Sequence, residues 1–288
     1  VTTKFDMASV EKSQYQNINN AGNLSLTGFK YTDENGKSMN INSAKIQFNP
    51  SRVNLQEFKA TTGKSDLSIT GVLDNFYGFA FRNQELKGNF TMNSNQISVA
   101  DFTSTTAPTK TESKEAPKTE AMKIPAFLNC SLTAKAKTVL YDNLTLKDCA
   151  GKLIVKDQTV TLQNVITSVF GGQIGLNGMV STKEKTPKFN MDLGLNKVDI
   201  AQTFTQLDML KKIAPIAGAV SGKLNSTIKL SGNLNANEMT PDLKTISGDL
   251  LGQLLSTTVN EKNSKLLSAL TSNVKFLDVS KLNLNDVK

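Results

Sequence analysis

The sequence predicts a mainly β protein: one long, curved antiparallel meander sheet of duplicated β-groove modules, with one or two short amphipathic helices. Three observations predict this fold: an internal repeat of two β segments, apolar residues at alternating positions, and few large core residues. Aromatic residues make up 6% of the 288 residues, and tryptophan is absent. Such a composition is typical of a thin sheet with one apolar face and one solvated face.

The repeat lies in residues 53–73 (VNLQEFKATTGKSDLSITGVL) and 160–180 (VTLQNVITSVFGGQIGLNGMV), which align without a gap. The identical positions are Val53/Val160, Leu55/Leu162, Gln56/Gln163 and Gly71/Gly178. The positions that stay apolar are Leu67/Ile174, Ile69/Leu176 and Leu73/Val180. An internal repeat of this kind indicates a duplicated structural unit.

Residues 105–122 separate the two copies and consist mostly of Thr, Lys, Glu, Ala and Pro. A segment without apolar periodicity cannot bury enough surface to offset the entropy lost on ordering. We therefore expect a disordered linker here, between a first β module at 1–104 and a second at 123–288.

The predicted strands are segments in which every second residue is apolar. Before the linker they are 23–31, 39–48, 52–60, 65–73, 76–82 and 86–92. After it they are 127–138, 144–155, 159–168, 173–181 and 188–196. Their connections are short, so we expect antiparallel neighbours, because a parallel crossover needs a dozen or more residues.

Helical periodicity enters late in the chain. Asp199 is a candidate N-cap for a helix at about 200–213. Its apolar stripe would consist of Ile200, Phe204, Leu207, Leu210 and Ile213. A weaker helical pattern spans about 259–271. We expect both helices to cover one end or side of the sheet, and the first to cover part of its apolar residues.

The only two cysteines are Cys130 and Cys149. If 127–138 pairs with 144–155 through a turn near 141–143, Cys130 faces a residue near 155. Cys149 then lies several positions away along the strands, too far for a disulfide. We expect two small buried apolar residues, with a disulfide between them as the alternative.

The net charge of +8 comes from scattered lysines, and the only arginines are Arg52 and Arg82. A nucleic-acid-binding protein would cluster its positive charge and combine it with arginine and stacking aromatic residues. The sequence therefore predicts no nucleic-acid partner and a solvated, lysine-rich face. No stretch reaches the roughly 20 apolar residues that span a bilayer.

Histidine is absent from the chain. Its absence removes the commonest general base, the serine triad and most zinc sites. Carboxylates such as Asp74, Asp157 and Asp192 fall at turns or at outward strand positions, where solvation accounts for them. We therefore expect no enzyme, no catalytic residue, no metal site and no cofactor.

The alternating apolar residues allow two structures. Two sheets can pack face to face as a sandwich with a closed core. Alternatively, the apolar face can line a groove that is open to a lipid chain. Periodicity alone does not decide between them.

Several short motifs of the second copy follow one another in a specific order. They are 139–148 (VLYDNLTLKD), 151–157 (GKLIVKD), 170–174 (FGGQI), 198–200 (VDI), 220–224 (VSGKL) and 230–234 (LSGNL). Over residues 126–270 this order resembles the C-terminal conserved region of the AsmA family, large bacterial envelope proteins related to TamB. The first copy resembles it less clearly.

The resemblance implies a periplasmic β-groove that carries phospholipid from the inner to the outer membrane and so serves outer-membrane biogenesis. It also implies attachment to the inner membrane through an anchor outside residues 1–288. Phospholipid is the expected partner, with outer-membrane assembly proteins as a further candidate. The family offers no catalytic motif.

The residues expected to line the groove alternate along the strands of the second copy. They are Leu153, Val155, Leu162, Ile174, Leu176, Phe189, Met191, Leu193 and Leu195. Two other functions remain open: a structural or adhesive β-sandwich domain with a closed core, and a scaffold in outer-membrane protein assembly.

Overall fold

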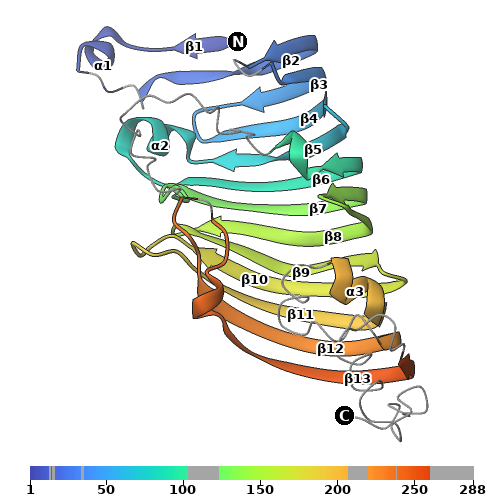
Figure 1. Ribbon diagram of the computed structural model, residues 1–288. Helices are drawn as coiled ribbons and strands as arrows, with labels where there is room; N and C mark the ends of the chain where they lie inside the picture. Colours follow the sequence, from blue (N-terminus) through green and yellow to red (C-terminus); the bar gives the residue numbers. More distant parts are fainter. Residues whose placement is uncertain are drawn as a thin grey trace, which may run out of the picture.

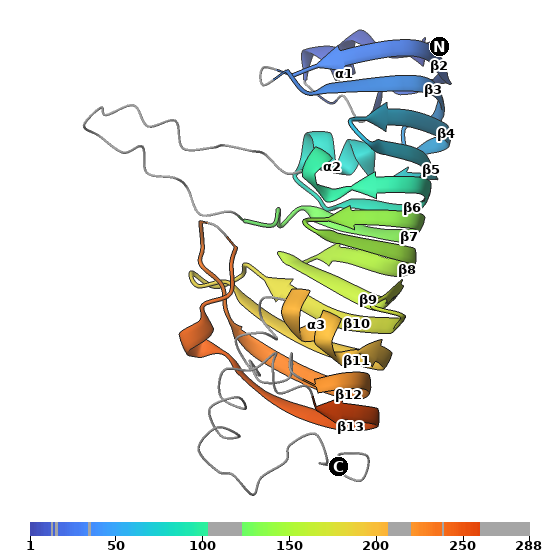
Figure 2. The same cartoon turned by 45° about the vertical axis from the view of Figure 1, so that its right-hand side comes forward.

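The structure is a computed structural model, and it describes residues 1–12, 14, 17–33, 36–102, 123–206, 220–237 and 239–259. Within these residues the chain forms one open sheet of thirteen strands, which lie side by side in chain order (Figure 1). The predicted fold class is confirmed, because the protein is mainly β and the sheet is a long, mostly antiparallel meander. The sheet twists and curves along its length (Figures 1 and 2).

Apart from the three-residue β1, the strands are long, with 10 to 14 residues each. Those of the first module are β1 (Thr2–Lys4), β2 (Asn19–Thr32), β3 (Ser38–Phe48), β4 (Arg52–Thr62), β5 (Ser65–Asp74) and β6 (Leu86–Ser98). Those of the second are β7 (Leu128–Tyr141), β8 (Leu144–Lys156), β9 (Thr159–Val169), β10 (Gly172–Ser181), β11 (Lys188–Asp199), β12 (Val220–Asn233) and β13 (Ser247–Val259).

The sequence repeat is a structural repeat of two hairpins, β4–β5 and β9–β10. The equivalent cross-strand pairs are Val53–Leu73 and Val160–Val180, then Leu55–Gly71 and Leu162–Gly178. Both hairpins then contain a β-bulge at the same place, with residues 56–57 or 163–164 opposing a single residue of the partner strand. The two copies therefore share their register as well as their residues.

β6 and β7 form the one parallel pair among the described strands. Leu86 opposes Leu128 and Ser98 opposes Leu140, so the two modules join in one continuous sheet. The connection between these strands includes residues 103–122, which lie outside the described residues, as does the predicted linker. Parallel neighbours need such a long connection, whereas the short turns elsewhere produce antiparallel pairs.

Three short α-helices occur in the described residues: α1 (Met7–Glu11), α2 (Phe76–Arg82) and α3 (Ile200–Gln206). None of the described helices is long and apolar enough to cross a membrane. The strand predicted at 76–82 is wrong, because this segment is α2. Its sequence (FYGFAFR) is almost wholly apolar, and periodicity cannot separate a strand from a helix in such a run. Asn75 and Asn83 flank it with left-handed backbone, at φ 63° and 52°, which ends the extended conformation.

The predicted helix at Ile200 is confirmed at its start. The backbone N–H of Gln202 donates to Asp199 Oδ1 at 2.8 Å, so Asp199 caps the helix as expected. The rest of that prediction, residues 207–213, lies outside the described residues. The second predicted helix also lies outside them, except for Val259, which ends β13 instead.

The cysteines lie where the predicted hairpin places them. Cys130 opposes Val155 and Cys149 opposes Ala136, and both thiols are free. Burial raises the pKa of each thiol, which keeps both protonated at neutral pH. The expected full burial is wrong: both cysteines are half-buried, and Cys149 Sγ donates to Thr167 Oγ1 at 3.1 Å.

Candidate functional site

One face of the sheet carries apolar residues in rows that run across the strands. Residues that oppose each other in neighbouring strands point to the same face, as do residues two positions apart along one strand. The cross-strand register therefore shows which side chains share a face. We call the face that holds Leu55 the apolar face and the opposite one the polar face.

The central row of the apolar face crosses the sheet from β2 to β13 without a break. This Leu55 row consists of Leu24, Ile46, Leu55, Gly71, Phe90, Leu132, Leu153, Leu162, Gly178, Met191, Leu230 and Gly248. Every member is apolar or glycine, and each consecutive pair is a cross-strand pair. With about 4.8 Å between neighbouring strands, the row is about 50 Å long.

A second row lies on each side of the central one. The Val53 row consists of Gly22, Phe48, Val53, Leu73, Gly88, Cys130, Val155, Val160, Val180, Phe189 and Gly232. The Ile69 row consists of Leu26, Ala44, Phe58, Ile69, Met92, Ala134, Gly151, Val165, Leu176, Leu193, Ile228 and Leu250. Because residues of one face are two positions apart, the three rows are together about 14 Å wide.

The polar face carries hydroxyl, amide and ammonium groups at the intervening positions. Thr91, Thr133, Lys152 and Gln163 oppose one another in β6 to β9. Such side chains are satisfied by water and by one another. The sheet therefore has one wetted side and one side that water solvates poorly.

Coverage of the apolar face differs along the sheet. Leu24, at the N-terminal end of the Leu55 row, is 54% exposed, whereas Leu230 in β12 is 7% exposed. The apolar members between them, from Ile46 to Met191, are half-buried. α3 packs on β11 and β12 at the covered end (Figures 1 and 2). Its first residue, Ile200, belongs to the buried cluster of the protein.

All nine residues predicted to line a groove lie on the apolar face. The Leu55 row contains Leu153, Leu162 and Met191. The Val53 row contains Val155 and Phe189, and the Ile69 row contains Leu176 and Leu193. A further row, next to the Ile69 row, contains the opposing pair Ile174 and Leu195. Leu193 and Leu195 are buried in the cluster with Ile200, as expected of residues covered by the helix that begins there. The other seven are half-buried.

The sequence-based candidates all come from the second copy, although the rows continue through the first. Leu55 and Phe90 lie in the same row as Leu153 and Leu162. The sequence repeat could have identified the residues of the first copy, because Leu55 and Leu162 are identical at aligned positions. Had the groove prediction been extended to the first copy through this alignment, it would have included residues of β4 and β5.

The site is a surface rather than a cluster of reactive groups. In the part of the chain that the structure describes, no group of three or more His, Cys, Asp or Glu side chains could hold a metal ion. No family model, no curated protein and no solved structure matches this chain. Its function must therefore be argued from the chemistry of the apolar face.

An apolar face of this size is unusual on a protein surface. Monomeric proteins rarely expose a continuous apolar patch larger than about 300–600 Å², and larger ones mark sites that bind proteins, membranes or ligands. The three rows span about 14 Å by about 50 Å, and among the described residues α3 and Ile246 cover the end at β11 and β12. A long apolar molecule would fit such a surface better than a compact one.

Proposed function

We propose that this chain is a non-enzymatic, periplasmic segment of an AsmA-like protein. Its apolar face binds the acyl chains of phospholipids that move from the inner to the outer membrane. The resemblance of residues 126–270 to the AsmA family supports this proposal, as does the shape of the sheet. Attachment to the inner membrane and a role in outer-membrane biogenesis belong to the same proposal.

The single observation that carries the proposal is the unbroken Leu55 row. It crosses both modules, and most of its length is half-buried rather than sealed. In a closed sandwich a second sheet would cover these residues, but all thirteen described strands belong to one sheet. Separate strands of one sheet thus act as a continuous track.

The energetics favour acyl chains as the occupant. Each buried methylene group contributes about 0.8 kcal/mol, so ten of them contribute about 8 kcal/mol before the cost of immobilisation. Half of a bilayer's hydrocarbon core is about 15 Å thick, so one extended acyl chain spans several strands of the row. Because neighbouring stretches of the row are chemically alike, a lipid can move along it without a large change in free energy.

Lipid extraction and mass spectrometry of the purified chain test the proposal. We expect phospholipid to co-purify with the wild-type protein and with Thr133→Glu, which alters the polar face. Leu132→Glu, one residue earlier in β7 but on the Leu55 row, should lose most of that lipid because a carboxylate interrupts the apolar track.

Circular dichroism of both variants is the control for folding. Equal lipid content in folded Leu132→Glu and Thr133→Glu, or no lipid in the wild-type protein, would contradict the proposal. Recovery of outer-membrane assembly proteins in place of lipid would favour the scaffold function.

A further inference from the structure

A cavity lies at the end of the strands, between the β3–β4 turn and α2. Its volume is about 670 Å³, and both arginines of the chain, Arg52 and Arg82, line it. The other basic residues are all lysines, which are scattered over the sequence. Arginine differs from lysine in presenting a planar set of donors that matches the oxygens of a phosphate. The gathering of both arginines at one cavity is therefore chemically specific.

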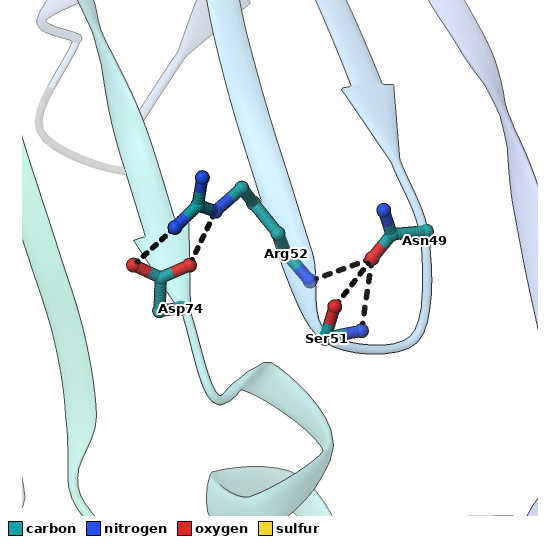
Figure 3. Close-up of polar contacts among 4 residues, drawn as sticks. All are labelled: Asn49, Ser51, Arg52 and Asp74. Atoms are coloured by element: carbon teal, nitrogen blue, oxygen red, sulfur yellow. Dashed lines mark hydrogen bonds and ion pairs between the residues drawn. The ribbon is translucent and has the colours of Figure 1, made fainter.

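Arg52 is held in a defined orientation. Its Nε donates to Asp74 Oδ1 at 2.6 Å and its Nη2 donates to Asp74 Oδ2 at 3.3 Å (Figure 3). A guanidinium has five N–H donors, so this pairing leaves three for another acceptor. The ion pair with Asp74 also raises the pKa of Arg52, which keeps the guanidinium charged.

The turn beside Arg52 is fixed by one amide side chain. Asn49 Oδ1 accepts hydrogen bonds from the backbone N–H of Arg52 at 2.9 Å and of Ser51 at 3.0 Å (Figure 3). On the other side of the cavity, Tyr77 of α2 accepts a hydrogen bond from Asn20 Nδ2 at 3.0 Å, which ties α2 to β2. Both walls of the cavity are therefore anchored to the sheet.

Arg82, the last residue of α2, makes the cavity electropositive. It is exposed, and the ion pairs among the described residues do not include it. Two guanidinium groups therefore face one carboxylate, that of Asp74, at this cavity. The excess positive charge favours an anion.

The cavity lies at the strand ends, one residue beyond the outermost apolar row. Arg52 and Asp74 oppose each other, and the next pair along the same strands is Val53 and Leu73 of the Val53 row. Arg52 and Asp74 lie about 3.4 Å along the strands from this row, but successive residues point to opposite faces, so their side chains lie on the polar side of the sheet. A phospholipid held by its phosphate at this cavity would therefore pass around the ends of β4 and β5 to place hydrocarbon on the apolar face.

We propose that this cavity binds a phosphate group, and that its natural source is the headgroup of a phospholipid whose acyl chains lie on the apolar face. The inference rests on the proposed function for the identity of the ligand. Arg82 and the free donors of Arg52 bind the phosphate oxygens, while Asp74 positions Arg52. The cavity then acts as a loading point where the polar part of the lipid is held at the strand ends.

Nuclear magnetic resonance of the full chain labelled with [¹⁵N]arginine tests this directly, because two arginines yield only two Nε–H signals. Three probes are titrated: dihexanoylphosphatidylglycerol, inorganic phosphate and dihexanoylglycerol. We expect the phospholipid to shift both Nε signals. Arg82→Gln should weaken its binding about tenfold, the effect of losing one charge-assisted contact. Lys229→Gln, which removes the same charge from the exposed polar face of β12, should leave the affinity unchanged.

The probes separate the possible failures. Equal phospholipid affinity in Arg82→Gln and wild type, with unmoved Nε signals, would overturn the inference and leave the proposed function standing. Equal affinity for inorganic phosphate and phospholipid, without binding of dihexanoylglycerol, would assign the cavity to free phosphate and overturn both the headgroup assignment and the proposed function. Tighter binding of the phospholipid than of either other probe supports both.

Discussion

Two regions of the sheet, one at β2 and one at β12, use the same pattern of residues for different purposes. In β2, Leu24 of the apolar face is 54% exposed, whereas in β12 Ile228 of the same face is fully buried. The strands themselves are alike, since both alternate apolar and polar positions. The difference arises where the chain places α3 on β11 and β12. Alternation therefore creates an apolar face, and the neighbouring segments decide whether that face becomes a core or a binding surface.

The repeated hairpins sharpen this comparison because their geometry is so similar. β4–β5 and β9–β10 share register and bulge position, yet they lie at different distances from the covered end. The same substitution on the apolar face of two regions should therefore change stability by different amounts where their coverage differs, because the geometry of the strands is the same.

The largest expected effect separates core from surface. Ile228→Ala should lower the free energy of unfolding by about 2–5 kcal/mol, because it leaves a cavity in a fully buried cluster. Leu24→Ala, at the exposed end, should lower it by less than about 1 kcal/mol. Urea unfolding followed by circular dichroism measures both. Similar losses in the two variants would show that the two ends do not differ in coverage.

A second pair of variants tests how closely the strands of the apolar face approach one another. A Cβ at Gly71 would collide with the Phe90 ring, so Gly71→Val should destabilise the protein by about 1–3 kcal/mol. Gly175→Val is the matched control, because a Cβ there meets no atom within 4 Å. Thermal unfolding should show a lower midpoint for the first variant only. A lower midpoint for Gly175→Val alone would mean that the register is misassigned.

The smallest effect concerns a polar contact between β5 and β6, away from the end that α3 covers. Burial raises the pKa of Asp66, but hydrogen bonds from the backbone of Gln96 and Asn95 outweigh it, and the net pKa is lowered from 3.8. A lowered pKa stabilises the fold above the unfolded pKa, and this stability is lost as the pH falls through the folded pKa. Asp66→Asn should therefore be less stable than wild type at pH 7.

The check on this last variant is the pH dependence of the difference. Thermal midpoints of the two proteins should converge as the pH falls below about 4. A difference that stays constant from pH 7 to pH 3 would show that the charge of Asp66 does not contribute.

Much of the fold could be predicted from the sequence, because alternation has a direct structural consequence. The segment 188–196 alternates strictly and lies within β11, and the repeat correctly paired β4–β5 with β9–β10. The sequence could not show whether residues 76–82 form a strand or a helix, because a continuous apolar run has neither the helical nor the strand periodicity. The left-handed backbone of Asn75 and Asn83, which flank this segment, cannot be read from the sequence either.

The site was predicted only in part, for two physical reasons. Which residues α3 buries depends on tertiary packing, so Leu193 and Leu195 could not be separated in advance from their half-buried neighbours. Arg52 and Arg82 stood out as the only arginines, but 30 residues of sequence separate them, and only the fold brings them to one cavity.

Photo-crosslinking to phospholipid tests the central claim most directly. A photoreactive phenylalanine analogue is placed at Leu55, Phe90 or Leu153 of the Leu55 row, and in matched variants at an adjacent polar-face residue. The matched positions are Asn54, Thr91 and Lys152. We predict lipid adducts at all three row positions and none at their neighbours. Equal adduct yields on the two faces, or no adduct at any row position, would contradict the claim that the apolar face binds lipid.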